Sequence, residues 1–192
     1  MALQGRHDRR HLGWAAGLLC ALLIAAPAIA RDRTPFEARA GLDVAMAAAI
    51  AWAPDAALVY VENDESLDAN GASPRWGYLF YSGTEGRARA YSIREGKILT
   101  AENFEVKIEA PPLAEQWIDS GMALAIADKK AGLDFRRKHG GELGTMLLMR
   151  GVFNEKNPDQ TTWTVVYTAP DAPSLFVVVD AIEGKVRRTW RG

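Results

Sequence analysis

The chain has 192 residues, of which 48% are hydrophobic and 24% charged, a composition typical of a globular protein rather than of a disordered or fibrous one. Its 23 Lys and Arg residues balance 24 Asp and Glu residues, which gives a formal net charge of -1. This balance excludes the strongly basic field of a dedicated nucleic-acid binder.

Residues 1–30 have the three parts of a secretory signal peptide. A positively charged start precedes the apolar run 15–26, and Ala28-Ile29-Ala30 forms an A-x-A cleavage site. The alternative, an uncleaved membrane anchor, would need an apolar run of roughly 20 residues. We therefore expect cleavage after Ala30, periplasmic or secreted localisation, and no stable membrane span in the mature chain.

Two other export signals match less well. The residues after Arg9-Arg10 lack the apolar pair of a twin-arginine signal, and Leu19 is too large for the position before a lipidated Cys20. The general secretory route is therefore the prediction. Cleavage would remove Cys20, the only cysteine, and leave His139 as the only histidine. This excludes a cysteine nucleophile, a Cys-ligated metal and a site built on two histidines.

The mature sequence begins with two predicted helices. Thr34-Pro35-Phe36-Glu37 has the form of a capping box with Pro at the first helical position, which predicts a short helix that ends near Gly41. The Ala-rich stretch 43–52 has apolar residues at helical spacing, and Pro54 stops this second helix.

A strand over 58–61 and a polar turn with Asn70-Gly71 at its tip come next. The acidic residues of this turn resemble a calcium loop. The EF-hand register nevertheless fails, because Gly77 takes the twelfth position, where a bidentate Glu is required. We therefore predict a hairpin turn without a metal.

Two stretches of the chain share one pattern. WGYLFYSG begins at Trp76 and WTVVYTAP at Trp163, and each alternates apolar residues on one strand face. A turn and a second strand follow, and a Gly-Lys pair comes 20 or 21 residues after the Trp, at Gly96 and Gly184. The pattern indicates an internal repeat of β-hairpins, with both Trp side chains as core anchors.

The second copy starts with Asp119 or Ser120 as a helix N-cap and Gly132 as the helix end, followed by a strand over 145–149. It carries about 11 extra residues, which include Arg136-Arg137-Lys138-His139. We interpret this segment as an exposed basic loop, with an anion-contacting loop as the alternative.

Each copy is thus predicted as helix, strand, strand, strand. The predicted fold class is α+β, with two tandem units whose antiparallel sheets each pack on a helix. The predicted boundaries are a signal peptide over 1–30, a first unit over 31–99, a linker over 100–117 and a second unit over 118–192.

The end of the second hairpin resembles a PepSY domain. Val179-Asp180-Ala181 is followed there by Gly184-Lys185-Val186, and the first copy keeps Gly96-Lys97-Ile98 but has Ser92 in place of the Asp. The resemblance covers residues 42–99 and 118–190. It implies a cystatin-like fold, an extracytoplasmic location and an association with peptidase propeptides, where such domains inhibit the enzyme or assist its folding. Because no peptidase domain follows, a stand-alone module is the expectation.

No P-loop, nucleophile elbow, zinc-protease or dinucleotide motif occurs in the sequence. We interpret Asp180 as a turn residue that accepts backbone amides rather than as a buried catalytic acid. A carboxylate pair such as Glu62 and Asp180 is conceivable, but the spacing does not select it. We therefore predict that the protein is not an enzyme and has no catalytic, cofactor-binding or metal-binding residues and no cofactor.

The predicted function is a non-catalytic, exported PepSY-like binding module that acts on a protein partner, such as a peptidase or another envelope protein. The alternative is a periplasmic small-ligand-binding protein with a cavity between helix and sheet. An exposed strand edge or apolar patch would favour the first, and an apolar pocket with a few inward polar groups would favour the second.

Overall fold

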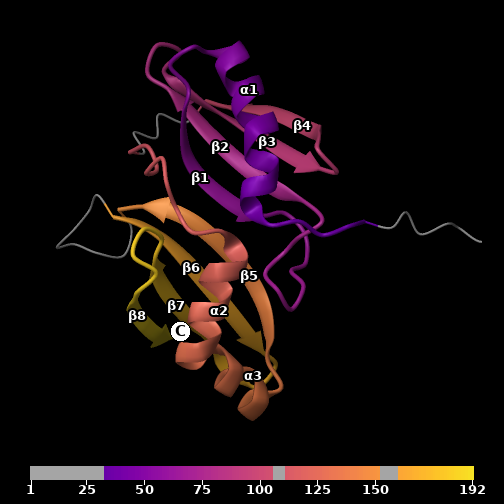
Figure 1. The fold of residues 1–192 in the computed structure, drawn as a ribbon, viewed down its shortest axis with the longest axis vertical. Coiled ribbons are helices and arrows are strands. Elements are labelled where there is room, and N and C mark those ends of the chain that lie inside the picture. Colours follow the sequence, from indigo (N-terminus) through magenta and orange to yellow (C-terminus); the bar gives the residue numbers. More distant parts are fainter. Residues whose placement is uncertain (1–32, 106–110, 152–159) are drawn as a thin grey trace, which may run out of the picture. The chain divides into compact units, whose positions relative to one another are not determined.

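A computed structural model describes residues 33–105, 111–151 and 160–192 (Figure 1). The predicted signal peptide, residues 1–30, lies outside these ranges. Within them, none of the helices is both long enough and apolar enough to cross a membrane.

The described residues form one antiparallel sheet of eight strands, in the order β4-β3-β2-β1-β5-β6-β7-β8. Its strands are β1 (Ala57–Asn63), β2 (Trp76–Ser82), β3 (Arg87–Arg94), β4 (Lys97–Phe104), β5 (Glu142–Arg150), β6 (Thr161–Ala169), β7 (Ala172–Asp180) and β8 (Val186–Arg191). The strands β1 and β5 pair in the middle of the sheet, and β4 and β8 form its edges. We call β1–β4 the first half of the sheet and β5–β8 the second half.

The predicted fold class is wrong, because the described strands form one sheet. Two tandem units with separate sheets were expected, but Val61 pairs with Leu148 and Glu62 with Leu147, so that both halves share one sheet. Each half also has four strands rather than three, because the chain continues after Gly96 and Gly184 as β4 and β8. Side-chain alternation shows where strands lie but not which strand edges pair, because that pairing uses only backbone groups.

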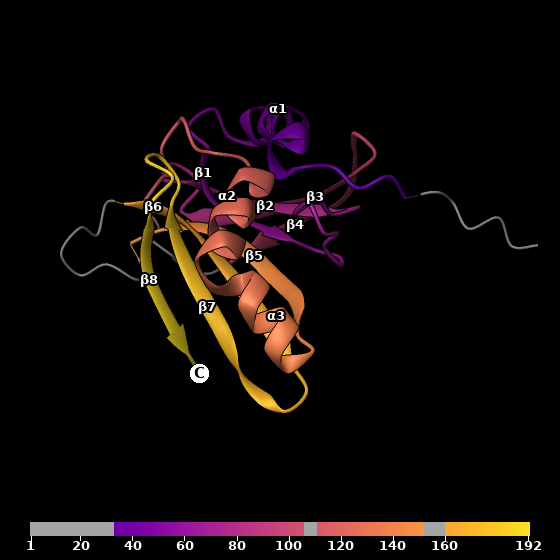
Figure 2. The same cartoon turned by 60° about the horizontal axis from the view of Figure 1, so that its bottom comes forward.

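The helices lie on one face of the sheet (Figures 1 and 2). A 3-10 turn, η1 (Ala38–Gly41), leads into α1 (Leu42–Trp52), which contacts β2 and β3. In the second half, α2 (Ser120–Ala127) contacts β6 and β7 and continues through a π-helical turn, η2 (Asp128–Gly132), into α3 (Leu133–His139).

The predicted helix end at Gly132 is wrong. A Cβ atom on Gly132 would lie 2.2 Å from Cζ of Tyr167, so this glycine permits close packing of the helix on β6. The hydroxyl of Tyr167 donates to Asp128 Oδ1 at 2.7 Å beside it. The helix ends instead at Gly140, whose φ of 59° is the left-handed conformation that glycine adopts readily at a C-terminus.

Both predicted core anchors are confirmed. Trp76 and Trp163 are fully buried, and their ring centroids lie 6.1 Å apart in an edge-to-face arrangement. The indole N–H of Trp76 donates to the carbonyl of Phe36 at 2.7 Å, and that of Trp163 donates to the carbonyl of Ile118 at 2.8 Å. The two rings therefore join the core of one half to the core of the other.

The predicted capping box at Glu37 is wrong, because its side chain makes no cap bond to its own helix. Glu37 Oε2 instead accepts the backbone N–H of Gly121, in the first turn of α2, at 3.2 Å. In return, Asp119 Oδ1 accepts the backbone N–H of Arg39, in η1, at 3.0 Å. Each carboxylate thus binds the start of a helix in the other half, where the helix dipole favours negative charge.

Candidate functional site

A groove of about 450 Å³ lies on the first half of the sheet. We call its lining residues on β1 and β4 the walls, and those on β2 and β3, which lie between these strands, the floor. The wall residues are Tyr60 and Glu62 on β1 and Thr100, Glu102 and Phe104 on β4. The floor residues are Gly77, Leu79, Ala90 and Ser92.

The strand register places these residues on the sheet face opposite the helices. Directly paired residues of antiparallel strands point to the same side, and side chains alternate along each strand. The buried residues Trp76 and Tyr78, on the helix side of β2, flank Gly77. One row across the groove is Glu62, Gly77, Ser92 and Thr100, and the next is Tyr60, Leu79, Ala90 and Glu102.

The second half of the sheet carries larger residues at the matching positions. Trp76 pairs with Ile93 and Trp163 with Val179, so the two hairpins have the same register. Counting from these pairs matches each groove residue with one in the second half. The matches are Gly77 with Thr164, Ser92 with Val178, Ala90 with Phe176, and Glu102 with Trp190.

These differences explain why the groove lies in the first half. Phe176 and Trp190 stack with ring centroids 4.8 Å apart, and they fill this face of the second half. Ala90 and Glu102 stand in their places in the first half, where no such stack forms. The two halves therefore share one backbone arrangement, but large side chains cover this face in the second half and leave a groove in the first half.

Glu62 is held in place on the β1 wall of the groove. The hydroxyl of Tyr60 donates to Glu62 Oε2 at 2.6 Å. Burial raises the pKa of Tyr60, and the hydrogen bond to Glu62 and the charge of Glu62 raise it further. Tyr60 therefore remains a protonated donor that orients the carboxylate, and the other oxygen, Oε1, has no hydrogen-bond partner among the described residues.

The groove also contains a charge-compensated end. Arg75 Nε lies 3.6 Å from Asp64 Oδ2, and the hydroxyl of Ser92 donates to the same carboxylate. A Cβ atom on Gly77 would lie 2.7 Å from Asp64 Oδ1, so the absence of a side chain at Gly77 leaves room for this carboxylate. Asp64 is thus engaged within the protein.

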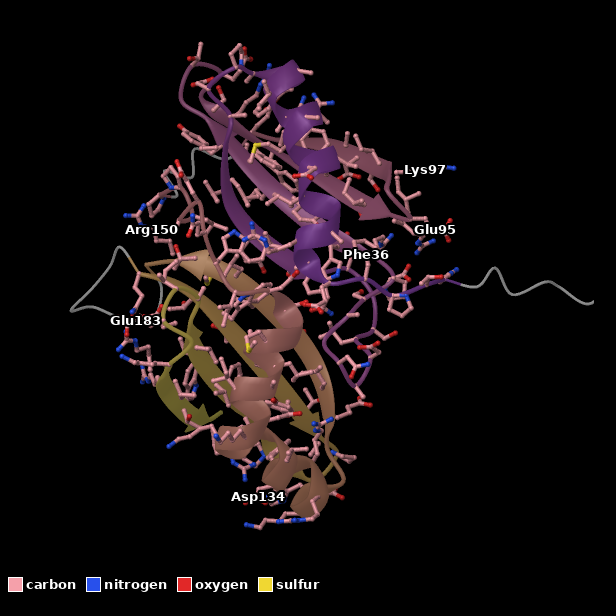
Figure 3. All side chains as sticks on the ribbon, viewed as in Figure 1. Phe36, Glu95, Lys97, Asp134, Arg150 and Glu183 are labelled. Carbon is pink, nitrogen blue, oxygen red and sulfur yellow. The ribbon has the colours of Figure 1, made fainter. Side chains whose placement is uncertain are left out.

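The edge strand β4 borders the groove. All eight of its residues are exposed, including the apolar Ile98, Leu99 and Phe104. Among the described residues, no strand pairs with its outer edge. Figure 3 shows Glu95 and Lys97 pointing away from the sheet at the turn that leads into this strand. An edge of this kind presents backbone donors and acceptors to a further strand.

Asp180 lies at the end of β7 as the predicted turn residue, and that interpretation is confirmed. Its Oδ1 accepts the backbone N–H groups of Ile182 at 2.8 Å and Glu183 at 2.9 Å. Its Oδ2 accepts Nε of Arg187 at 3.1 Å and also binds Gln160. Burial alone would raise the pKa of Asp180, but the hydrogen bonds from Glu183, Arg187 and Ile182 outweigh it and lower the pKa.

Glu62 and Asp180 do not form a carboxylate pair. Three strand spacings separate β1 from β7 in the sheet, a distance of about 14 Å. The two carboxylates of a glycosidase-type site lie roughly 5 to 9.5 Å apart. Glu62 on β1 and Glu102 on β4 both line the groove, whereas Asp180 lies outside it.

The basic segment that we expected as an exposed loop is the last turn of α3, and Asp134, labelled in Figure 3, lies in the first turn of the same helix. Arg136 is partly buried, forms an ion pair with Asp128 and lies 5.8 Å from the ring centroid of Tyr167. Arg137 and Lys138 are exposed and pair with Asp134. The imidazole of His139, the remaining member, lies 3.0 Å from Nη2 of Arg191 on β8.

The groove was not among the features that the sequence predicted. We expected a ligand cavity between helix and sheet, whereas this groove lies on the opposite face. A signal was nevertheless present in the two hairpins, because Gly77, Ala90 and Ser92 occupy positions where the second hairpin has Thr, Phe and Val. A position-by-position comparison of the hairpins would have pointed to it.

Fold and groove together define a class of protein, an antiparallel sheet with helices on one face and a groove on the other. No protein-family model matches the chain, and no curated protein does. Among solved structures, a protein described as a "putative lipoprotein" from Clostridium difficile 630 is similar to it, with a TM-score of 0.55 and 16% sequence identity. The match covers 77% of this chain and 90% of that one, and it establishes a shared fold.

Proposed function

We propose that the protein is an exported, non-catalytic PepSY-like module that binds an extended segment of another exported protein. The segment lies along β4 with side chains in the groove. The observation that carries this proposal is the position of the groove, which opens beside a strand edge that no described strand covers.

The edge favours a polypeptide as the ligand. An extended chain can add to an exposed strand by backbone hydrogen bonds, while pockets for alternate side chains give specificity. Ile98, Leu99 and Phe104 add exposed apolar surface on the same strand. A volume of about 450 Å³ lies within the range of ligand pockets.

Two further features support the rest of the proposal. The buried acid Asp180 and the groove acid Asp64 are both engaged in hydrogen bonds with the protein, which fits a structural rather than a catalytic use. The signal-like residues 1–30 and the description of the similar solved structure as a "putative lipoprotein" support export. Of the PepSY-like residues Val179-Asp180-Ala181, the first two end β7 and Ala181 begins the turn into β8.

To test the proposed function, a larger side chain is placed in the groove. Ala90→Phe introduces the residue that the second half carries at the matching position, so the fold should tolerate it. Ala101→Phe is the matched control, because Ala101 is exposed on the neighbouring strand β4 and pairs with the buried Tyr91, on the sheet face opposite the groove. Peptides are selected from a displayed random 12-residue library on the wild-type protein, and their affinities for the variants are measured by fluorescence anisotropy.

Ala90→Phe should weaken binding of the selected peptides by at least roughly tenfold, and Ala101→Phe by less than about twofold. Equal binding to wild type and Ala90→Phe, or the absence of peptides enriched over an unrelated protein, would overturn the proposal. Circular dichroism melts of both variants check that each is folded.

The second candidate is a small amphiphilic ligand, which the apolar floor and the inward Glu62 and Ser92 favour. Amide hydrogen exchange separates the two candidates. A peptide added to the edge protects β4 amides on binding, whereas a small molecule in the groove leaves the outer edge of β4 exchanging as before.

A further inference from the structure

We propose that the bound segment is basic, and that Lys or Arg side chains of the partner enter the groove, whose two walls carry the carboxylates Glu62 and Glu102. This inference rests on the proposed function and names the chemistry that the same groove selects.

The charge balance of the groove supports a cation. Asp64 is compensated by Arg75 at one end. Glu62 and Glu102 stand on opposite walls, and among the described residues neither has a cationic partner. Two carboxylates facing one partly enclosed space attract a cation more strongly than the same charges would on a flat, fully hydrated surface.

The shape of the groove suits a long aliphatic stem. Gly77 and Ala90 keep the floor low, Leu79 adds apolar surface to the floor, and Phe104 adds it to the β4 wall. Lys and Arg side chains combine an apolar stem with a charged head, and they bury the stem on apolar surface while the head binds elsewhere. The floor and the walls thus match the two parts of such a side chain.

Glu62 is preorganised for this role. Because Tyr60 binds only Oε2 at 2.6 Å, the second oxygen of the carboxylate can accept a hydrogen bond from an ammonium or guanidinium group. Tyr60 also fixes the side chain of Glu62 before the ligand binds, so that less side-chain conformational entropy is lost on binding.

The second half of the sheet has the opposite character. Arg188 stands where the first half has Thr100, and Trp190 stands where it has Glu102. The Arg188 guanidinium carbon lies 5.0 Å from the centroid of the Trp190 ring, so the matching surface is cationic and filled. The preference for a basic ligand is therefore confined to the groove.

The test combines the peptide selection with charge variants. Peptides enriched on the wild-type protein should contain Lys or Arg more often than the starting library. Glu62→Gln and Glu102→Gln should each weaken binding of an enriched basic peptide by roughly fivefold to tenfold, and should reduce the salt dependence of its affinity. Glu102→Lys should shift the selection toward peptides with Asp or Glu.

The outcomes separate this inference from the proposed function. Enriched peptides without a basic preference, or unchanged affinity in both Gln variants while Ala90→Phe still abolishes binding, would overturn the basic segment and leave the groove function standing. Unchanged binding to Ala90→Phe would overturn both. Melting curves of the charge variants show whether each is folded, and Glu102→Gln, on an exposed strand, provides the test if Glu62→Gln is destabilised.

Discussion

At the scale of single residues, Asp180 closes a turn and fixes the edge strand that follows it. Its two carboxylate oxygens have different partners. Oδ1 accepts the backbone N–H groups of Ile182 and Glu183, and Oδ2 binds the guanidinium of Arg187 on β8. All of these bonds favour the ionised carboxylate. The stability of the turn should therefore depend on the protonation state of this one side chain.

Asp180→Asn should destabilise the protein at pH 7 by about 1 to 3 kcal/mol, because it removes the charge that Arg187 binds. The pKa of Asp180 is lower in the folded protein than in the unfolded chain. Its contribution is therefore complete above about pH 4, the ordinary range of aspartate, and is lost as pH falls through the folded-state pKa.

Urea melts of wild type and variant at pH 7, 5 and 3 measure this difference, which should shrink at the lowest pH. Asp134→Asn, in the exposed first turn of α3, is the control and should stay within about 0.5 kcal/mol of wild type. A difference that grows as the pH falls would contradict this account of Asp180.

At the scale of secondary structure, the sequence predicted most elements but not how they end or pair. Ala-rich helical spacing and the Trp76 alternation correctly indicated α1 and β2, because side-chain periodicity records which face is buried. The helix end predicted at Gly132 was wrong, because a glycine can either terminate a helix or leave room for a neighbouring ring. The ring that packs on Gly132 belongs to Tyr167, 35 residues further along the chain. Such distant contacts leave no local pattern.

The same reasoning applies to the α3 helix and its basic residues. Arg136 and Arg137 are neighbours in sequence, but the helix directs Arg136 to Asp128 and Tyr167, and Arg137 to solvent and Asp134. Arg136→Ser should therefore cost about 1 to 3 kcal/mol of unfolding free energy, and Arg137→Ser less than about 0.5 kcal/mol. Denaturant melts of the two variants test this, and equal losses would show that Arg136 is as weakly held as its neighbour.

At the scale of the whole described fold, contacts between the two halves are of three kinds. Backbone pairs join β1 to β5, and the rings of Trp76 and Trp163 meet in the core. The carboxylates of Glu37 and Asp119 each accept a backbone N–H from a helix start in the other half. Separating the halves would break the middle of the sheet and expose both indoles. We therefore expect neither half to retain its structure when the other unfolds.

This arrangement predicts one cooperative unfolding transition. Trp76→Ala and Trp163→Ala should each lower the free energy of the whole transition by roughly 3 to 5 kcal/mol, because each removes a fully buried ring that both halves contact. Trp76→Phe should lower the free energy of unfolding by less. It keeps an aromatic ring in the core and loses mainly the hydrogen bond to the carbonyl of Phe36.

Urea unfolding followed by circular dichroism, together with native-state hydrogen exchange of β2 and β6 amides, measures the effect in both halves. Under one transition, Trp76→Ala accelerates exchange in β6 as well as in β2, because amides of both strands exchange through the same global opening. Two separate transitions, or acceleration confined to the half that carries the substitution, would show that the halves unfold independently despite the shared sheet.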